Sequence, residues 1–265
     1  MPPPVALTVA GSDNSAGAGI QADLKTFTHF RVFGQTVITC VVAEVPGVVR
    51  AIQAIDPENI RQQLELSLTY FPVRAVKTGM LYSAEIVHTV CDVLERLPLS
   101  DRPQIVVDPV MVASSGDLLL QPDAIDAYRD RLIPMAALVT PNMDEMSTLH
   151  GDKIRNRTDL ERVGRELAEK LGVPVLAKGG HLRGQQAIDL LIQSEKVIVY
   201  RSVHYSERST HGTGCTYSAA IAAGLALGQD LADAVAAAKV FVSRAIKDSF
   251  CWEGQAGSVE ALKLF

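Results

Sequence analysis

The stretch VALTVAGSDNSAGAGIQADLKTF (residues 5–27) decides the fold class, because it joins three kinds of segment in a fixed order. A short apolar run comes first and predicts a buried strand. A glycine-rich turn follows, and the residues after it have the spacing of a helix. A buried strand that leads directly into a helix is the repeating unit of parallel α/β folds.

The same alternation continues along the chain. Strands are predicted at residues 5–10, 34–42, 75–78, 104–107, 138–140, 175–177, 187–192 and 197–200. Helices are predicted at residues 20–30, 57–70, 83–97, 122–132, 158–171, 215–227 and 231–249. Most of the strands are short and almost wholly apolar, which predicts a mostly parallel, doubly wound sheet covered on both faces. The last two are separated by a short polar turn and predict an antiparallel hairpin at one edge.

Composition narrows the class of protein. The chain has 265 residues, of which 48% are hydrophobic and 21% charged, as in ordinary soluble proteins. The net charge of −5 and the lack of a long basic block argue against binding to nucleic acid or to an anionic membrane. A phosphate-bearing ligand would therefore be held by local donors. Without a linker, a low-complexity tract or an internal repeat, residues 1–265 are expected to form one domain.

The cysteines and the N-terminal residues predict a location. Cys40, Cys91, Cys215 and Cys251 have neither CxxC nor metal-ligand spacing, and this pattern favours reduced thiols in a cytoplasmic protein. We see no signal peptide, and no apolar run approaches the roughly 20 residues that a membrane span needs.

Ligands of parallel α/β sheets bind beyond the carboxyl ends of the strands, so the residues that follow each strand are expected on one common rim. These segments are residues 11–19, 43–47, 79–80, 108–113, 141–145 and 178–181. The unusual chemistry of the sequence falls almost wholly on them.

The tetrapeptide GTGC (residues 212–215) stands at the start of a predicted helix. Its backbone amides and the positive end of the helix dipole predict an anion cradle suited to phosphoryl transfer. The same field is expected to lower the pKa of Cys215, which makes this thiol a candidate nucleophile or proton acceptor. The alternative is a packing turn in which Cys215 is a small buried residue.

Polar residues follow three other predicted strands. Asn142 and Glu145 are three residues apart and suit a hydrated Mg²⁺, or else they cap the helix that follows; both roles can hold at once. Lys178 precedes two glycines and reads as a phosphate contact or as a surface lysine. Asp108 ends an apolar strand, where a carboxylate can orient metal-bound water or a phosphate partner.

The first glycine cluster matches neither the P-loop nor the GxGxxG pattern. It places Asp13 and Asp23 near the rim, and its glycines let a ligand approach the backbone; Asp23 can instead be a solvated charge on a helix face. Met80 is a candidate wall of a flat apolar pocket or simple filler. His211 is expected to be a structural donor to a carbonyl.

Taken together, the segments resemble the hydroxymethylpyrimidine/phosphomethylpyrimidine kinases of thiamine biosynthesis, a branch of the ribokinase-like superfamily. The matching stretches run in the family's order from residue 9 to residue 228: VAGSDNSAGAGIQADLKTF, VKTGMLYSAEIV, VVDPVMVASSGDLLL, TPNMDEMSTLHG, VLAKGGH and THGTGCTYSAAIAAGLALG. The resemblance implies a three-layer α/β sandwich with a mostly parallel central sheet and a small antiparallel edge. It also implies ATP, Mg²⁺, a homodimer, and phosphorylation of 4-amino-5-hydroxymethyl-2-methylpyrimidine and then of its monophosphate.

The resemblance assigns roles to residues on the rim. It implies an anion hole at the glycine turn, with the cysteine standing where sugar kinases of the superfamily carry a catalytic aspartate. Catalytic residues are expected at Gly212, Thr213, Gly214 and Cys215, and substrate contacts at Gly11, Asp23, Glu44, Met80 and Val107. Nucleotide contacts are expected at Asn142, Lys178 and Thr210, and Mg²⁺ ligands, acting through water, at Asp108 and Glu145.

The sequence departs from the family at Glu44, where relatives carry a glutamine that contacts the aminopyrimidine edge. An amide donates and accepts, whereas an ionised carboxylate only accepts. Three explanations stay open: a protonated ring nitrogen, a protonated Glu44, or another substrate such as pyridoxal, pyridoxine or a different pyrimidine. A more remote alternative is a ligand-binding protein without catalysis. Ala16 replaces a usual glycine, and Ser114 replaces a frequent lysine.

Overall fold

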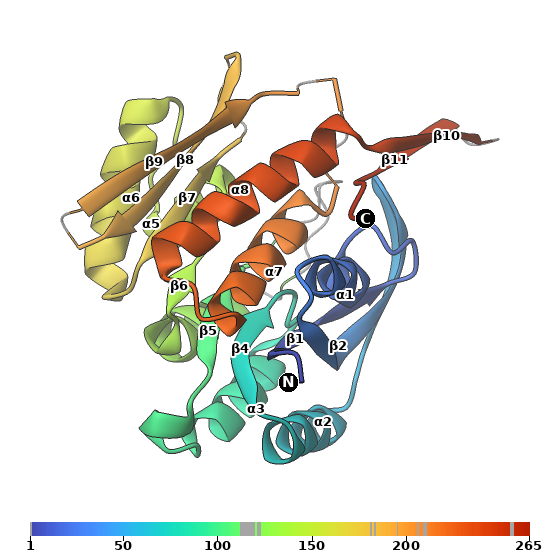
Figure 1. The fold of residues 1–265 in the computed structure, drawn as a ribbon. Helices are drawn as coiled ribbons and strands as arrows, with labels where there is room; N and C mark the ends of the chain where they lie inside the picture. Colours follow the sequence, from blue (N-terminus) through green and yellow to red (C-terminus); the bar gives the residue numbers. More distant parts are fainter. Residues whose placement is uncertain are drawn as a thin grey trace.

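A nine-stranded sheet forms the centre of the molecule, with the strand order β3-β2-β1-β4-β5-β6-β7-β8-β9 (Figure 1). The computed structural model describes residues 2–111, 120, 123–180, 182, 184–194, 196–205, 207–208, 211–254 and 257–265. The predictions for Ser114 and Thr210 lie outside these residues. The strands of the sheet are β1 (Val5–Asp13), β2 (Phe33–Val45), β3 (Val48–Ala54), β4 (Val73–Thr78), β5 (Gln104–Val107), β6 (Leu138–Val139), β7 (Val175–Gly179), β8 (Gln186–Gln193) and β9 (Lys196–Val203).

In the order of the sheet, strands β2, β1, β4, β5, β6 and β7 pair in parallel, and antiparallel strands form both edges. On one side β3 pairs with β2, and on the other β8 pairs with β7 and β9 with β8. The predicted hairpin at residues 187–200 is thus confirmed. The edge strand β3 was missed because most of its side chains face solvent, so that the segment lacks the apolar run of a buried strand. The segment 43–47 is not a simple loop either, because β2 continues to Val45 and turns into β3 at Gly47, where φ is +84°.

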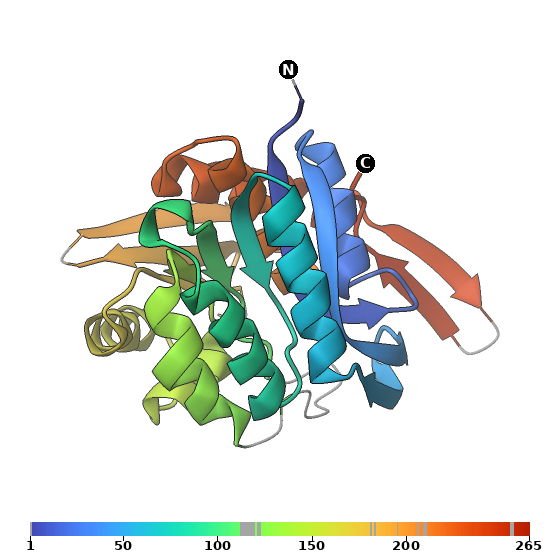
Figure 2. The same ribbon diagram turned by 90° about the horizontal axis from the view of Figure 1, so that it is seen from below.

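Helices cover both faces of the sheet, as Figure 2 shows from below. They are α1 (Gly19–His29), α2 (Pro57–Tyr70), α3 (Ala84–Glu95), α4 (Ala124–Ala127), α5 (Met143–His150), α6 (Arg157–Leu171), α7 (Thr213–Ala226) and α8 (Leu231–Lys247). One hydrophobic cluster packs the helices α2, α3, α4, α5 and α6 against one face of the sheet, and a second packs α1, α7 and α8 against the other face. The three-layer α/β sandwich is therefore confirmed.

The structure differs from the predicted elements in two further places. The helix predicted at residues 122–132 is regular only over α4 and continues as a π-helical turn, Tyr128–Leu132. A two-stranded sheet of β10 (Phe250–Gly254) and β11 (Gly257–Ala261) follows α8 and projects from the body of the molecule, and the sequence patterns did not indicate it (Figure 1). Among the described residues, no helix has both the length and the apolar character required to cross a membrane.

Helix α7 positions the candidate site. Seven of its fourteen residues are alanine or glycine, and the helix is buried on nearly all sides. Small side chains let it lie close to α8 and to the strands β4 and β5 beneath it. Its N-terminus therefore points at the carboxyl ends of the central strands, where the sequence placed the rim.

Candidate active site

A cavity of about 670 Å³ lies at the carboxyl ends of the central strands. Eleven of the predicted site residues line it, and they come from seven separate stretches of the chain: Gly11, Glu44, Met80, Asp108, Asn142, Glu145, Lys178, Gly212, Thr213, Gly214 and Cys215. The common rim predicted from the strand ends is thus present in the structure.

Two predicted substrate contacts do not reach the cavity. Val107 is fully buried inside β5, where it packs with the apolar core. Asp23 is also fully buried. Its carboxylate accepts hydrogen bonds from Thr8 Oγ1 at 2.6 Å and from Lys77 Nζ at 2.8 Å. The side chain of Asp23 is therefore neither a substrate contact nor a solvated charge on a helix face. No local sequence pattern indicates its partner Lys77 on β4.

The start of α7 is packed against the first glycine turn. Gly212 has φ +77°, and a Cβ built on it would lie 1.8 Å from the carbonyl oxygen of Gly17. Only glycine satisfies both demands. The side-chain oxygen of the next residue, Thr213 Oγ1, is buried and has no hydrogen-bond partner among the described residues. A buried hydroxyl beside unpaired helix amides is a fitting place for an anion.

Asp13 holds the glycine turn in shape. Its carboxylate accepts hydrogen bonds from the backbone N–H of Ser15 at 2.7 Å, of Ala18 at 2.8 Å and of Gly17 at 3.1 Å. His211 Nε2 lies 3.4 Å from the same carboxylate, so this histidine pairs with Asp13. Burial opposes the charge of Asp13, but these hydrogen bonds together lower its pKa to about 2.

Lys178 is fixed beside α7 by Asp108. The ammonium donates to Asp108 Oδ1 at 3.0 Å, and the carboxylate also accepts from Thr140 Oγ1 at 3.0 Å and from Ser218 Oγ at 3.1 Å. Burial disfavours both charges, but the pair holds the pKa of Asp108 low and that of Lys178 high. A Cβ on Gly214 would lie 3.4 Å from Lys178 Nζ, so the cation stands next to the amides of the helix start.

Asn142 and Glu145 form a capping box at the start of α5. Asn142 Oδ1 accepts from the backbone N–H of Asp144 and Glu145, both at 2.9 Å, and Glu145 Oε2 accepts from the N–H of Asn142 at 2.7 Å. The capping role that the sequence allowed is confirmed. Burial raises the pKa of Glu145 to about 8. The charge of Lys178 lowers this pKa and partly offsets the effect of burial, whereas the charge of Asp108 raises it further.

The expectation of a depressed thiol pKa at Cys215 is wrong. Burial raises the pKa of Cys215 to about 11. Lys77 and the backbone N–H of Gly19 act in the opposite direction, while Asp23 and Asp108 raise the pKa further. Burial thus raises the pKa of Cys215 by more than the Lys77 cation and the Gly19 amide lower it.

Glu44 lies at the far end of the cavity from Lys178, on the segment of β2 that turns into β3. Its backbone N–H donates to Asn14 Oδ1 at 2.7 Å, which ties this strand to the glycine turn. The carboxyl is half-buried. Burial and the charge of Asp13 raise the pKa of Glu44, and His211 acts in the opposite direction. The cavity therefore favours a neutral Glu44 more than bulk water does.

The sequence analysis missed the other half of the cavity. This half is lined by β8, β9, the segment after β9, α7 and α8 through Ala187, Asp189, Ser202, Val203, Tyr205, Tyr217, Lys239, Val242, Ser243 and Ile246. It is mainly apolar, with a buried ion pair of Lys239 Nζ and Asp189 Oδ2 at 2.6 Å. Most of these residues lie inside helices and strands, and Val203 and Tyr205 stand at and after the end of the antiparallel edge strand β9, so a rule based on the ends of the parallel strands could not find them.

Comparison with known proteins identifies the family. Residues 13–260 match the family model described as phosphomethylpyrimidine kinase. A Streptomyces coelicolor protein named hydroxymethylpyrimidine/phosphomethylpyrimidine kinase is 43% identical over 97% of this chain and 94% of its own length. A Rhizobium meliloti protein of the same name is 42% identical over 91% of this chain and 90% of its own length. The chain therefore belongs to the phosphomethylpyrimidine kinase family, and it is a phosphotransferase.

A solved structure agrees with this assignment. The ADP complex of Bacillus subtilis pyridoxal kinase superposes with a TM-score of 0.87 at 36% identity and covers 98% of this chain and 97% of its own. The ribokinase-like fold implied by the sequence resemblance is thereby confirmed.

The substitution Gly212→Ala tests the packing at the start of α7. We expect it to push the two turns apart, lowering kcat by about 100-fold or more and the stability by about 2 kcal/mol, because the new Cβ meets Gly17. Steady-state kinetics and thermal unfolding measure both effects. Gly228→Ala is the matched control, because Gly228 also has positive φ but no atom within 4 Å of a built Cβ. Equal losses of activity in both variants would contradict the packing argument.

Proposed function

We propose that this phosphomethylpyrimidine kinase family member transfers the γ-phosphoryl group of ATP to the hydroxyl of 4-amino-5-hydroxymethyl-2-methylpyrimidine, and a second phosphoryl group to the resulting monophosphate, for thiamine biosynthesis. One observation carries the proposal. The N-terminus of α7 and Lys178 line the same continuous cavity as Glu44 of β2 and the residues of β9 and α8, so that a donor and an acceptor can meet at one anion-binding point.

The apolar half of the cavity suits the nucleotide. Val203, Tyr205, Val242 and Ile246 line it, and apolar walls of this kind accommodate a purine base. A base placed there directs its phosphates toward Lys178 and the amides of residues 212–215. The ADP complex of the B. subtilis pyridoxal kinase, a protein of the same fold, supports a nucleotide in this family of sites.

The other half suits a small aromatic ring. Gly11 lines it and packs closely against Cys40, since a Cβ would lie 2.9 Å from Cys40 Sγ, and Met80 and Val42 provide apolar walls. Glu44 is the polar group at the end of this pocket. A neutral carboxyl donates through its O–H and accepts through its C=O, so it can pair with an aminopyrimidine edge as an amide does.

The reaction needs charge stabilisation more than covalent chemistry. Lys178 and the amides at residues 212–215 would hold the transferring phosphoryl group, whose transition state carries its charge on the outer oxygens. In the first transfer the acceptor is an alcohol, and its proton must leave as the new O–P bond forms. Cys215, at the mouth of the helix, is the proposed acceptor of that proton.

Mg²⁺ is part of the proposal, and the donor set fits it. Glu145 and Asp108 line the same part of the cavity, and the charge of Asp108 helps to raise the pKa of Glu145. Asn142 is a poor direct ligand, because its Oδ1 already accepts two backbone hydrogen bonds. We expect Glu145 and Asp108 to hold the ion through water. Bound Mg²⁺ would neutralise charge on the ATP phosphates.

A kinase for pyridoxal or pyridoxine is the second candidate function, and Glu44 is the observation that favours it. A pyridine nitrogen is basic enough to pair with a carboxylate. B. subtilis pyridoxal kinase has the same fold as this chain. This candidate keeps the phosphoryl-transfer chemistry and changes only the ring that is recognised.

We further propose that residues 1–265 act as one domain of a cytoplasmic homodimer. The central sheet draws its strands from residue 5 to residue 203, and α7 and α8 pack back on it, which supports a single folding unit. The four cysteines are free, as in a reducing compartment. The edge strand β3 and its neighbour β2 expose Val41, Val45 and Val48, and a second copy would cover this apolar edge.

A substrate panel tests the main proposal. With ATP and Mg²⁺, we expect the hydroxymethylpyrimidine to be phosphorylated with a kcat/KM at least about 100-fold above that of pyridoxal, because a site with fixed polar partners rejects the wrong pattern. Faster turnover of pyridoxal would favour the second candidate. Binding of both rings without turnover would favour a non-catalytic protein.

The two successive transfers separate the possible roles of Cys215. The monophosphate attacks through a phosphate oxygen that is already deprotonated near neutral pH, so its transfer needs no base. We therefore expect Cys215→Ala to lower kcat of the first transfer by about 100-fold or more and that of the second by less than about tenfold. Rapid-quench assays on each substrate measure both. An equal loss in the two steps would assign Cys215 to the anion hole alone.

Glu44 predicts a pH dependence. Its pKa is raised, so the neutral, donating form persists above the usual range of a carboxyl and is lost as pH rises through the raised value. We expect KM for the hydroxymethylpyrimidine to increase over that interval in the wild type and to stay constant in Glu44→Gln, whose amide does not titrate. The same pH profile of KM in both proteins would overturn the role of a neutral Glu44.

A further inference from the structure

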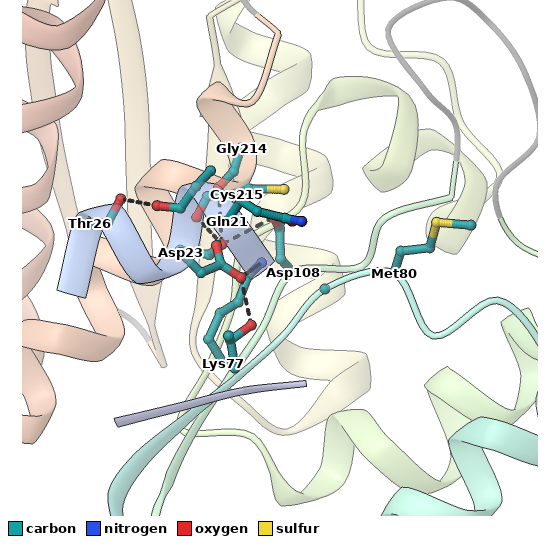
Figure 3. Close-up of polar contacts among 12 residues, drawn as sticks. Gln21, Asp23, Thr26, Lys77, Met80, Asp108, Gly214 and Cys215 are labelled. Carbon is teal, nitrogen blue, oxygen red and sulfur yellow. Dashed lines mark hydrogen bonds and ion pairs between the residues drawn. The ribbon is translucent and has the colours of Figure 1, made fainter. Parts of the chain in front are cut away.

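Beneath the start of α7 lies an ion pair that the proposed reaction does not use. Lys77 Nζ and Asp23 Oδ2 are 2.8 Å apart, and neither side chain has any exposed surface. Figure 3 shows the pair rising between β4 and α1, close to Cys215 and Asp108 and apart from Met80. Helix α7 packs directly on β4, so the pair forms the floor below the helix N-terminus.

Stability alone is a weak reason for such a pair. Two charges removed from water cost several kcal/mol each, and replacing a buried pair by apolar residues is often neutral or stabilising. The pair here is also incompletely satisfied. Asp23 Oδ2 receives both Lys77 and Thr8, while Asp23 Oδ1 is buried without a hydrogen-bond partner among the described residues. This arrangement fits a fixed charge that acts on a neighbour better than it fits a structural link.

The backbone gives the ammonium room at this place. A Cβ built on Gly79 would lie 2.8 Å from Lys77 Nζ and 3.0 Å from the Cβ of Ala10. Glycine at the end of β4 thus lets the cation stand directly under the cavity floor. Although burial disfavours the charged form, Asp23, Cys215 and Asp108 raise the pKa of Lys77, so the charge is permanent at working pH.

Charged groups surround the sulfur of Cys215 from several elements. Its charge interacts with those of Lys77 on β4, Asp23 on α1, Asp108 after β5 and Lys178 on β7. Of the charges that act on the thiol, Lys77 has the largest effect, and it favours the thiolate. Asp23 acts against the thiolate more weakly while it holds the lysine in place.

We propose that Lys77 is a positioning residue whose buried ammonium, held by Asp23, stabilises the negative charge on the sulfur of Cys215. The proposal rests on the proposed function, in which Cys215 takes the hydroxyl proton. In that step the O–H bond of the alcohol breaks, an S–H bond forms on the thiolate, and the alcohol oxygen bonds to the γ-phosphorus as ADP leaves. Lys77 exchanges no proton, and its charge sets how much thiolate is available.

Alkylation of Cys215 tests this without substrate. The rate of carboxamidomethylation by iodoacetamide, measured across a pH series by peptide mapping, follows the thiolate fraction. The background variant Cys251→Ser removes the exposed thiol. In Lys77→Met/Asp23→Asn, a pair of similar shape without charge, we expect the profile to move to higher pH and the rate at about pH 8.5 to fall by about 3- to 10-fold. In Asp23→Asn, which keeps the cation, we expect the rate to rise.

The shape of the profile separates charge from structure. A change in access scales the rate equally at every pH, whereas loss of the cation moves the midpoint. A double variant with an unmoved midpoint overturns the proposal. Lys239→Met/Asp189→Asn is the matched control, because it removes another buried ion pair at 2.6 Å and should leave the midpoint unchanged; an equal shift there also overturns the proposal.

A third variant covers the case in which the charge-free pair does not fold. Gly79→Ala retains both charges and displaces the ammonium, so we expect the same direction of shift; an unchanged profile counts against the proposal. The two hypotheses fail separately. If Cys215→Ala keeps the first transfer, the proton-acceptor role is lost while the effect of Lys77 on the thiol still stands. If the midpoint does not move, Lys77 is excluded whatever Cys215 does.

Discussion

The contact between Gly212 and the carbonyl of Gly17 is the constraint on which the site depends. It joins the turn after β1 to the turn before α7, two segments about two hundred residues apart in the chain, with no room for a side chain between them. Asp13 makes this possible, because it collects the backbone N–H groups of its own turn and pairs with His211 next to Gly212. Once the turns are locked, the N-terminus of α7 can point only into the cavity, and the anion-binding amides are set before a ligand arrives.

Burial is the second organising force, and it acts against charge throughout the cavity. It raises the pKa of Cys215, Glu145 and Glu44, while Asp13 stays ionised only through its hydrogen bonds. Where lysines are buried near the cavity, each is paired with an aspartate: Lys77 with Asp23, Lys178 with Asp108 and Lys239 with Asp189. A site arranged this way keeps fixed cations near bound phosphates, and removal from water makes each of them more effective than at a surface.

The sequence predicted the architecture well because the alternation of apolar runs and helices is a local pattern. The rim followed from topology, since every parallel strand ends at the same side of the sheet, and eleven predicted residues line one cavity. What failed depended on distant partners. The residues next to Asp23 in the chain do not indicate that Lys77 is its partner. The residues next to Cys215 do not indicate how strongly burial acts on the thiol, so the depressed pKa inferred from the helix start was wrong. The apolar half of the cavity was missed for the same reason, because Val242 and Ile246 look like ordinary packing positions of a helix.

The distribution of charge also orients the proposed substrate. One end of the cavity carries Asp13 and Glu44, and the middle carries Lys178 and the start of α7. The proposed ring carries its amino and hydroxymethyl groups on adjacent carbons, and this charge distribution favours the orientation with the amino group toward Glu44 and the reacting oxygen toward Cys215. The same charge distribution orients the monophosphate more strongly, because its phosphate is repelled by the acidic end of the cavity and attracted by Lys178. Pyridoxal brings a basic ring nitrogen, which would pair in its protonated form with an ionised Glu44, whereas the neutral carboxyl suits the donor and acceptor groups of the aminopyrimidine edge. The protonation of this one carboxyl therefore governs both the affinity for the aminopyrimidine and the discrimination between the two rings.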